Sequence, residues 1–497
     1  MSEDAILAKV DRIHHAQKKY NIFISTRPVN DLRNQILSNI DDDRPLTGTL
    51  CAIKDNIVTK NEATTCASAI LKDYQASFNA TVVELLENNG SVIIGKANLD
   101  EFGMGANNTH SFTGQTLNPM YDDEKSSETL LDKHKYVPGG SSGGSAAAVS
   151  AELCDFALGS DTGGSVRLPA AYCGVYGFKP SYGRISRYGV LPYADSLDTV
   201  GILARSLRVT RKVYDVLNQS DVKDPSSICD EVRSKISKTV TRLARVEDTE
   251  KITIGISKDY LAKGVTPDIL VTLELIASKL FESGYTIVPV DIPSLPISIP
   301  AYFATAYSEA ASNLSRYEGV ERGYSNIATD GSEDYKSFIS KNKLQGFGNE
   351  VQKRLLIGNY NLSSEKFRDN SRKAQAIRDR LRNEFNSIFK MPNALTVTDF
   401  ENAEIDAMSV DFIIAPISTT KAPKLEDLNN KRNVDPISAY VNDAFLIPSS
   451  LTGLPSISVP WHSSGSEYPT GLQIIGQYGD DQRVLDFAEK VGELNTF

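Results

Sequence analysis

Short unbroken apolar runs and longer stretches with helical spacing alternate along the whole chain. Runs with the length and flanks of buried strands lie at residues 49–53, 91–95, 155–159, 251–257, 286–292, 410–417, 456–460 and 471–476. Helical spacing separates them at residues 79–90, 144–153, 267–283 and in long stretches between about 299 and 390. The first of these helices has Asn79 as its expected cap and Gly90 as its stop. This alternation predicts an α/β fold with one large, mixed β-sheet covered by helices on both faces.

The ends and polar stretches of the chain refine this picture. Residues 1–25 contain Glu3, Asp4 and Asp11 and no long apolar core, so we expect a surface helix and no secretory signal, and the case for a transit peptide is weakened. The longest apolar segment, 269–281, is interrupted by Glu274 and is too short to span a membrane. Two polar stretches, 121–136 and 220–235, lack sustained periodicity and are predicted to be surface excursions, although the second could also mark a domain boundary.

Composition narrows the class of protein. A net charge of −10 disfavours the chain as the main binding surface for a nucleic acid, so any tRNA would be bound mostly by a partner. The five cysteines form no CxxC pair, which predicts buried free thiols in a reducing compartment and no zinc site.

Three polar clusters interrupt the apolar runs and carry the candidate chemistry. Lys54 ends the strand at 49–53, at the edge where open α/β sheets place ligands, although a lone lysine can also extend from a strand end into solvent. Residues 138–149, PGGSSGGSAAAV, combine glycines and serines with a following helix, a pattern that also occurs in flexible linkers. Residues 159–171, GSDTGGSVRLPAA, form the third cluster, which could be a nucleophile turn, an anion-binding loop or a simple turn.

The third cluster suggests an alcohol nucleophile beside an oxyanion hole. Two adjacent glycines allow backbone amides to converge on one point, with Ser165 beside them. The donors we expect are the amides of Thr162, Gly163, Gly164 and Ser165. Among the five histidines only His110 lies in a plausible loop, so we favour Lys54 as the base, with Ser141 relaying the proton. A lysine can do this near neutral pH only if burial and its neighbours lower its pKa.

These clusters resemble the amidase signature family. The run GGSSGGS, the run GSDTGGSVRLPAAYCGVYGFKPSYGRIS and the upstream KDN match the family's lysine, cis-serine and serine at Lys54, Ser141 and Ser165. The resemblance implies the amidase-signature fold as a single domain over residues 1–497, with the catalytic region at 45–210. It also implies attack of the serine on an amide carbonyl, release of ammonia or an amine from an acyl-enzyme, and hydrolysis by water.

Further phrases spread over most of the chain are similar to the A subunits of glutamyl-tRNA(Gln) amidotransferases. They are NLDEFGMGANNTHSFTGQTLNP, YSEAASNLSRYEGV, GFGNEVQKRLLIGNY and FLIPSSLTGLPSISVP. This resemblance implies free glutamine as substrate, with Arg354 on its α-carboxylate, Asp443 on its α-amino group and Tyr302 lining the pocket. From the residues alone, Glu350 and Arg354 could equally be an exposed i, i+4 helix pair, and Asp443 a plain surface acid.

The same resemblance has consequences for partners and compartment. Ammonia would pass to the B subunit of the amidotransferase, which would be joined by a small third subunit. The B subunit would bind most of the Glu-tRNA(Gln) and use ATP and magnesium, so this chain needs no cofactor of its own. A lead-in shorter than that of the bacterial relatives resembles fungal mitochondrial versions, which favours the mitochondrial matrix over a bacterial-type cytoplasm.

Three other interpretations stay open at this point. One is a stand-alone amidase acting on another small amide, and another is a scaffold that has lost catalysis. The third is a nucleotide-binding module, because GSVIIGKA at 90–97 nearly spells a P-loop, although it lacks the final Ser or Thr and its middle residues are those of a strand.

Overall fold

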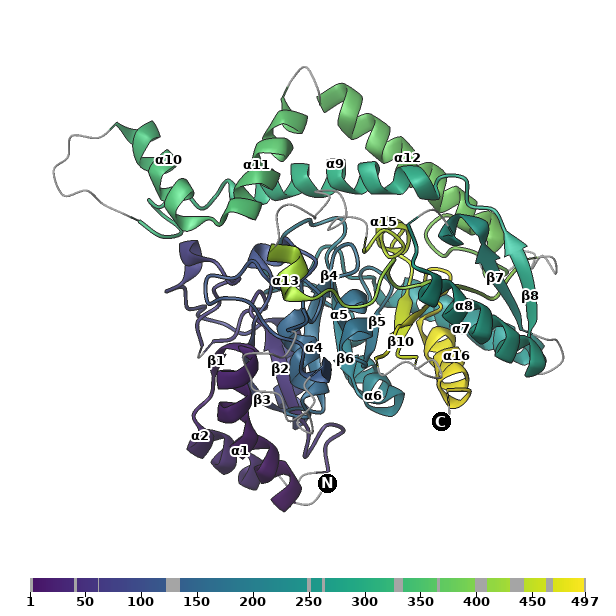
Figure 1. The fold of residues 1–497 in the computed structure, drawn as a ribbon, viewed down its shortest axis with the longest axis horizontal. Helices are drawn as coiled ribbons and strands as arrows, with labels where there is room; N and C mark the ends of the chain where they lie inside the picture. The colour runs from purple at the N-terminus through teal and green to yellow at the C-terminus, as the bar shows by residue number, and fades with distance from the viewer. Residues whose placement is uncertain are drawn as a thin grey trace.

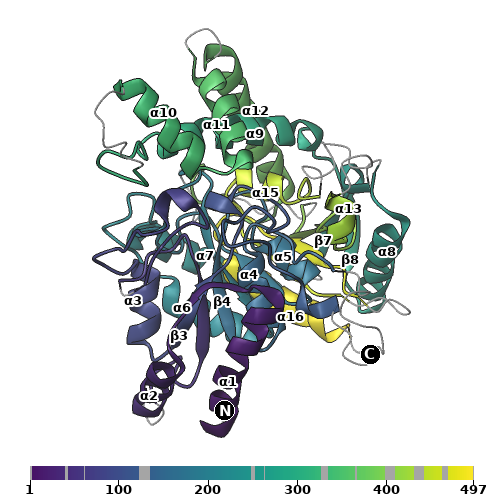
Figure 2. The ribbon, with the colours of Figure 1, turned by 60° about the vertical axis from the view of Figure 1, so that its left-hand side comes forward.

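The computed structural model describes most of the chain (Figures 1 and 2). The described residues are 3–39, 43–60, 62–121, 135–247, 252–261, 264–325, 334–363, 367–397, 409–429, 442–461 and 468–495. The strands are β1 (Phe23–Thr26), β2 (Leu50–Lys54), β3 (Val92–Ala97), β4 (Phe156–Asp161), β5 (Tyr176–Lys179), β6 (Thr199–Ala204), β7 (Thr253–Ser257), β8 (Thr286–Val290), β9 (Phe412–Pro416), β10 (Ser456–Val459) and β11 (Leu472–Ile475). The helices are α1 (Glu3–Tyr20), α2 (Val29–Asn39), α3 (Thr81–Asn88), α4 (Gly143–Ser150), α5 (Arg167–Tyr172), α6 (Leu207–Leu217), α7 (Asp230–Glu247), α8 (Pro267–Glu282), α9 (Leu295–Leu314), α10 (Tyr335–Gly346), α11 (Asn349–Leu362), α12 (Phe367–Ile388), α13 (Leu425–Asn429), α15 (Ile447–Leu451) and α16 (Asp481–Glu493).

All eleven of these strands join one mixed sheet in the order β1-β3-β2-β4-β6-β5-β10-β11-β9-β7-β8. Strand β2 runs parallel to both β3 and β4, which brings the ends of the lysine strand and of the strand before the serine turn to the same edge. The centre of the sheet is antiparallel, because β10 pairs with β5 on one side and with β11 on the other. Strands β1 to β6 precede residues 220–235 and strands β7 to β11 follow them, so strands from both sides of this segment lie in the same sheet.

Helices cover both faces of the sheet, as the apolar pattern predicts. Along β4, Phe156 and Leu158 point into one core with residues of α3, α6 and α16, whereas Ala157 points into a second core with residues of α1, α4 and α5. The part of the sheet near β9 repeats this alternation, with Phe412 in the first core and Ile413 in a third core beneath α9 and α12. Helices α9 to α12 gather on one side of the molecule in both views (Figures 1 and 2).

Several local expectations are confirmed and others are wrong. Helix α1 buries Ile6, Val10 and Ile13 on one face, as its spacing predicts. The cap expected at Asn79 is wrong, because Ala80 precedes the first helical residue, and the Asn79 side-chain oxygen accepts instead from the Lys60 amide.

The two predicted polar excursions behave differently. The last six residues of 220–235 begin α7, whose Ile236 is fully buried, so the expectation of an aperiodic excursion is wrong there. Sparse apolar positions on an otherwise charged helix hid its periodicity. Most of the other excursion lies outside the described residues, but its ends are anchored, since Tyr121 stacks on Tyr136 and on Tyr468.

The prediction of buried free cysteines is confirmed only in part. Cys51, Cys66, Cys154 and Cys173 are buried free thiols as predicted, whereas Cys229 is exposed, which corrects the prediction for that residue. Among the described residues, no group of three His, Cys, Asp or Glu side chains is arranged to hold a metal ion. Within the same ranges, no helix is both long and apolar enough to cross a membrane.

Candidate active site

The end of β2 delivers Lys54 into the interior of the protein. Its side chain is fully buried, and Nζ donates to Ser141 Oγ at 2.7 Å, to Ser160 Oγ at 2.9 Å and to the Ser160 carbonyl at 3.2 Å. The peptide bond between Gly140 and Ser141 is cis, at the position where the family resemblance implies a cis-serine. The alternative of a lysine extended into solvent is therefore wrong.

Burial also changes the acidity of this lysine. Loss of hydration lowers the pKa of Lys54 from 10.5 to about 7, although the carboxylates of Asp100, Asp161 and Asp198 oppose that shift. The lysine can consequently exchange a proton with Ser141 near neutral pH, which is the condition that a lysine base requires.

A buried ion pair holds the turn that carries Ser165. Asp161 accepts from the amides of Gly164, at 2.8 Å, and Val166, at 3.1 Å, and so fixes the residues on either side of the serine. Arg167 Nη2 lies 2.9 Å from the same carboxylate. Burial alone would raise the pKa of Asp161, but the Arg167 guanidinium outweighs it and the pKa falls to about 2. The turn therefore keeps a permanent charge pair beneath it.

The far side of Arg167 connects the turn to the end of the chain. Its Nη1 atom donates to Ser449 Oγ at 2.6 Å, to Ser456 Oγ at 3.0 Å and to Gln473 Oε1 at 2.8 Å. A second link joins the turn to the glycine and serine loop, because the Ser142 amide donates to the Ser165 carbonyl at 3.1 Å. Helix α5 begins at Arg167, two residues after Ser165.

The backbone amides of the turn fall into two groups. The Gly164 amide is engaged by Asp161, which corrects the expectation that it donates to an oxyanion. Across the described ranges, the amides of Thr162, Gly163 and Ser165 donate to no acceptor. Three of the four expected donors thus remain available to a ligand.

One small cavity brings together residues that are far apart in the sequence. Its volume is about 70 Å³. The residues around it are Gly103, Gly105, Ala106, Asn107, His110, Ser165, Tyr302, Phe303, Glu350, Arg354 and Asp443. The serine turn and all three residues expected to bind an amino acid therefore share one space.

The helices α9 and α11 supply two of those residues. A methyl group added at Gly163 would lie 2.6 Å from the Tyr302 ring, so the tyrosine packs directly on the turn. Arg354 is only 7% exposed, and its guanidinium donates to Glu350 at 3.0 Å and to the Tyr193 hydroxyl at 3.2 Å. The alternative of an exposed helix pair is therefore wrong for Glu350 and Arg354.

Asp443 faces the same cavity from the segment before α15. Its Oδ1 atom is buried and has no hydrogen-bond partner within the described part of the chain. Burial raises the pKa of Asp443 to about 7, against the opposing effect of the Arg354 guanidinium. A cationic group bound beside it would favour the ionised carboxylate.

The structure adds residues that the sequence did not single out. Asn107 is 8% exposed, and its Oδ1 atom is buried without a partner in the described ranges, at the wall of the cavity. His110, the one histidine that the sequence placed in a plausible loop for a base, also lines the cavity, but its side chain is exposed. Ser141 contacts Lys54 instead. In the sequence, the phrase around Asn107 indicated only a resemblance to other proteins and gave no role for this residue. The pairing of Asp161 with Arg167 produces no periodic pattern, so the sequence did not predict it.

The near P-loop does not form a loop. Residues Val92–Ala97 are the buried strand β3, and Lys96 lies inside the protein, 3.1 Å from Asp55 Oδ1. This lysine is committed to a buried ion pair and cannot cradle a phosphate, so the nucleotide-binding interpretation is wrong.

The fold and this cavity define an enzyme of the amide-hydrolysing class. The family described as Amidase matches residues 4–485, and the chain belongs to that family. It is 43% identical over 468 residues to the mitochondrial A subunit of glutamyl-tRNA(Gln) amidotransferase from Candida albicans, covering 93% of this chain and 96% of the relative. The relative with the same name from Yarrowia lipolytica is 42% identical, with 90% of this chain and 92% of the relative covered.

Solved structures agree with these sequence relatives. The crystal structure of the A subunit of glutamyl-tRNA(Gln) amidotransferase from Thermotoga maritima is 31% identical, with a TM-score of 0.71 and coverage of 97% of this chain and 89% of that one. A 6-aminohexanoate cyclic dimer hydrolase has a TM-score of 0.77 at 20% identity and covers 100% of this chain and 94% of its own, which shows the shared fold alone.

Proposed function

We propose that this chain is the glutamine-hydrolysing A subunit of a mitochondrial glutamyl-tRNA(Gln) amidotransferase. The names of its relatives and their coverage of nearly the whole chain support this assignment. The single observation that carries it is the common cavity, in which Ser165 faces a buried arginine and an unpartnered carboxylate oxygen of Asp443 within the described residues. A guanidinium and a carboxylate are what the two charged groups of a free amino acid require.

Glutamine binds with its charged end toward α11 and its amide toward the turn. Arg354 pairs with the α-carboxylate, and Asp443 accepts from the α-ammonium group. The Tyr302 ring forms a wall beside the carbon chain. Asn107 Oδ1, which has no other partner in the described ranges, accepts an N–H of the side-chain amide.

Ser165 is the nucleophile and Lys54 the base. Neutral Lys54 takes the Ser141 proton while Ser141 takes that of Ser165, and the Ser165 oxygen bonds to the amide carbon. The amides of Thr162, Gly163 and Ser165 stabilise the oxyanion. The protonated lysine then returns a proton through Ser141 to the leaving nitrogen, and ammonia departs. Water hydrolyses the γ-glutamyl ester by the same relay, which releases glutamate.

The ammonia passes to the B subunit of the complex, which is joined by a small third subunit. The B subunit holds most of the Glu-tRNA(Gln) and uses ATP and magnesium to activate it, so this chain needs no cofactor. The net charge of −10 supports this division, because the chain as a whole repels the tRNA backbone.

Covalent labelling tests the assignment. The chain, co-expressed with the B subunit, is treated with a diazoketone analogue of glutamine and mapped by peptide mass spectrometry. We expect an adduct on Ser165 that excess glutamine suppresses and propionamide does not, and no adduct in Ser165→Ala. Suppression by propionamide, with faster hydrolysis of it than of glutamine, would instead identify a stand-alone amidase. A folded, partner-bound chain that remains unlabelled would contradict the proposal.

A further inference from the structure

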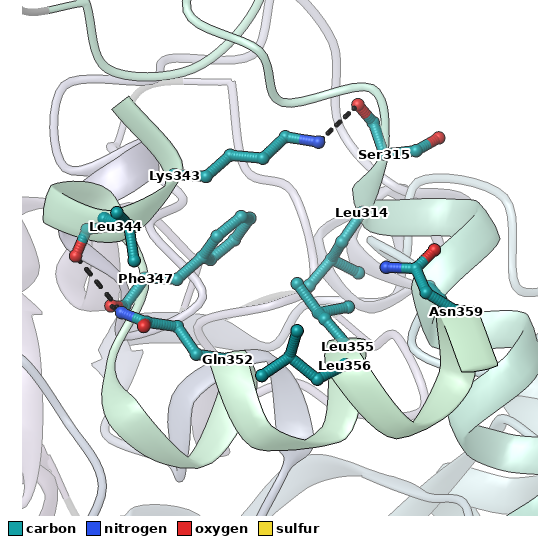
Figure 3. Close-up of a pocket in the computed structure, with 10 residues that line it drawn as sticks. Leu314, Ser315, Lys343, Leu344, Phe347, Gln352, Leu355, Leu356 and Asn359 are labelled. Carbon is teal, nitrogen blue, oxygen red and sulfur yellow. Dashed lines mark hydrogen bonds between the residues drawn. The ribbon is translucent and has the colours of Figure 1, made fainter. Parts of the chain in front are cut away.

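A groove separate from the active-site cavity lies among α9, α10 and α11 (Figure 3). Its volume is about 230 Å³. Leu314 and Phe347 are buried at its base, while Leu344 of α10 and Leu356 of α11 form its walls. Its lining is mostly apolar, and nothing in the mechanism above uses it.

The walls of the groove carry large apolar side chains that are strongly exposed to solvent. Leu356 is 72% exposed and Leu344 is 64% exposed, and two further residues of α11, Ile357 and Tyr360, are exposed as well. Single exposed apolar residues are ordinary, but a contiguous strip beside a groove marks an interaction surface.

Basic residues border this apolar strip. Helix α10 carries Lys336, Lys341 and Lys343 and no acidic residue within its bounds. Lys353 of α11 is 70% exposed, and its Nζ atom lies 3.7 Å from Glu350 Oε2. The chain as a whole has a net charge of −10, so this border stands out from the rest of the surface. The matching surface is an apolar stripe flanked by acidic side chains.

We propose that the groove receives an amphipathic helix of the B subunit, with its apolar face on Leu344 and Leu356 and an acidic flank on the α10 lysines. The inference rests on the proposed function, which requires a protein partner next to this chain. A helix laid into a groove between helices buries such a strip efficiently. A second copy of this chain would bring the same lysines together, and an RNA would leave the leucines exposed to water.

The position of α11 links this surface to the active site. Glu350 and Arg354 line the cavity from one face of the helix, whereas Gln352, Leu355 and Leu356 line the groove from another. A partner seated in the groove therefore fixes the helix that holds the substrate carboxylate. We expect the B subunit to lower the KM for glutamine, and this effect to be lost when the groove is blocked.

The test measures affinity between the purified full chain and the purified, fluorescently labelled B subunit with its small third subunit. Leu344→Glu and Leu356→Glu should each raise the Kd at least tenfold, whereas Leu356→Met should stay within twofold of wild type. The matched control is Val271→Glu on α8, a residue of similar exposure at 62% that lies outside the groove, and it should also stay within twofold. Unchanged thermal unfolding of the isolated variants excludes misfolding.

Three results would overturn the inference. The first is equal affinity of the wild-type and glutamate variants in a complex that hydrolyses glutamine, which leaves the proposed function intact. The second is loss of self-association, and the third is loss of tRNA binding, each with affinity for the B subunit unchanged. A wild-type chain that neither forms this complex nor hydrolyses glutamine would instead contradict the proposed function itself.

Discussion

The pH dependence of turnover should report the titration of Lys54. In the proposed mechanism only the neutral amine can accept the Ser141 proton, so the active fraction rises as pH rises through the lysine pKa. With that pKa lowered to about 7 by burial, roughly 9% of the enzyme is neutral at pH 6 and roughly 91% at pH 8. We therefore expect kcat to rise about tenfold between those values and then level off.

An unperturbed lysine would behave differently. With a pKa of 10.5 the neutral fraction would rise roughly 100-fold between pH 6 and pH 8 and would still be climbing about tenfold per unit at pH 9. The plateau, and not only the slope, therefore distinguishes the buried lysine from an exposed one.

Asp443 adds a second titration that the assay must separate. Its pKa is raised to about 7, and it must be ionised to bind the substrate ammonium, so it affects kcat/KM of the free enzyme in the same direction and range. In the bound complex the ammonium holds it ionised, and kcat should depend on one proton. An amide substrate without the α-amino group, such as glutaric acid monoamide, should give a kcat/KM profile with one proton as well.

The assay is release of glutamate and ammonia by the complex between pH 5.5 and pH 9, with Lys54→Arg as the inactive control. A kcat that is flat from pH 5.5 to pH 7 would refute the assignment of Lys54 as the base. Continued tenfold increases up to pH 9 would refute the lowered pKa.

Three further predictions follow from the site. Arg354→Lys should raise the KM for glutamine by about tenfold or more while changing kcat little, because an ammonium cannot form the paired bonds of a guanidinium, and 4-aminobutanamide, which lacks the carboxylate, should not respond. Asn107→Leu should lower kcat/KM for glutamine at least about tenfold but affect the γ-methyl ester of glutamate much less, since the ester has no N–H to donate, and equal losses would indicate a structural role. Arg167→Met should cost about 3–5 kcal/mol in denaturant unfolding because it leaves the Asp161 carboxylate buried and unpaired, and adding Asp161→Asn should recover part of the loss, so a cost below about 1 kcal/mol would contradict the reasoning.

The sequence predicted the layers of this fold because most of its strands are short, apolar and buried on both faces. Runs such as 155–159 are apolar almost throughout, and most of them end at or just before a glycine, a proline or a polar residue, so their positions could be predicted. Helix α7 was missed because its few apolar positions are scattered among charges. The order of the strands could not be read either, since β10 pairs with β5 across more than 270 residues (456 minus 179 is 277).

The sequence predicted residues of the site only where they form a recognisable local pattern. Paired glycines beside a serine mark a turn, and a lysine at a strand end marks the sheet edge. Glu350 and Arg354 have the spacing of an ordinary surface pair, so only the packing of α11 against α9 shows that they are buried. Asn107 is one polar residue in a polar loop, and only the cavity distinguishes it from its neighbours.

The position of β10 and β11 has a consequence for how the protein is made. These two strands, at residues 456–475, lie between β5 and β9, so they join the early half of the sheet to the late half. While the chain is still on the ribosome, both halves have open edges that can pair with other chains. Four acceptors of Arg167 also come from residues 449–473, so the turn with Ser165 gains its full support only when synthesis is nearly complete. Truncation before Ser456, which removes both strands, should therefore yield an aggregating chain and not a partly active enzyme.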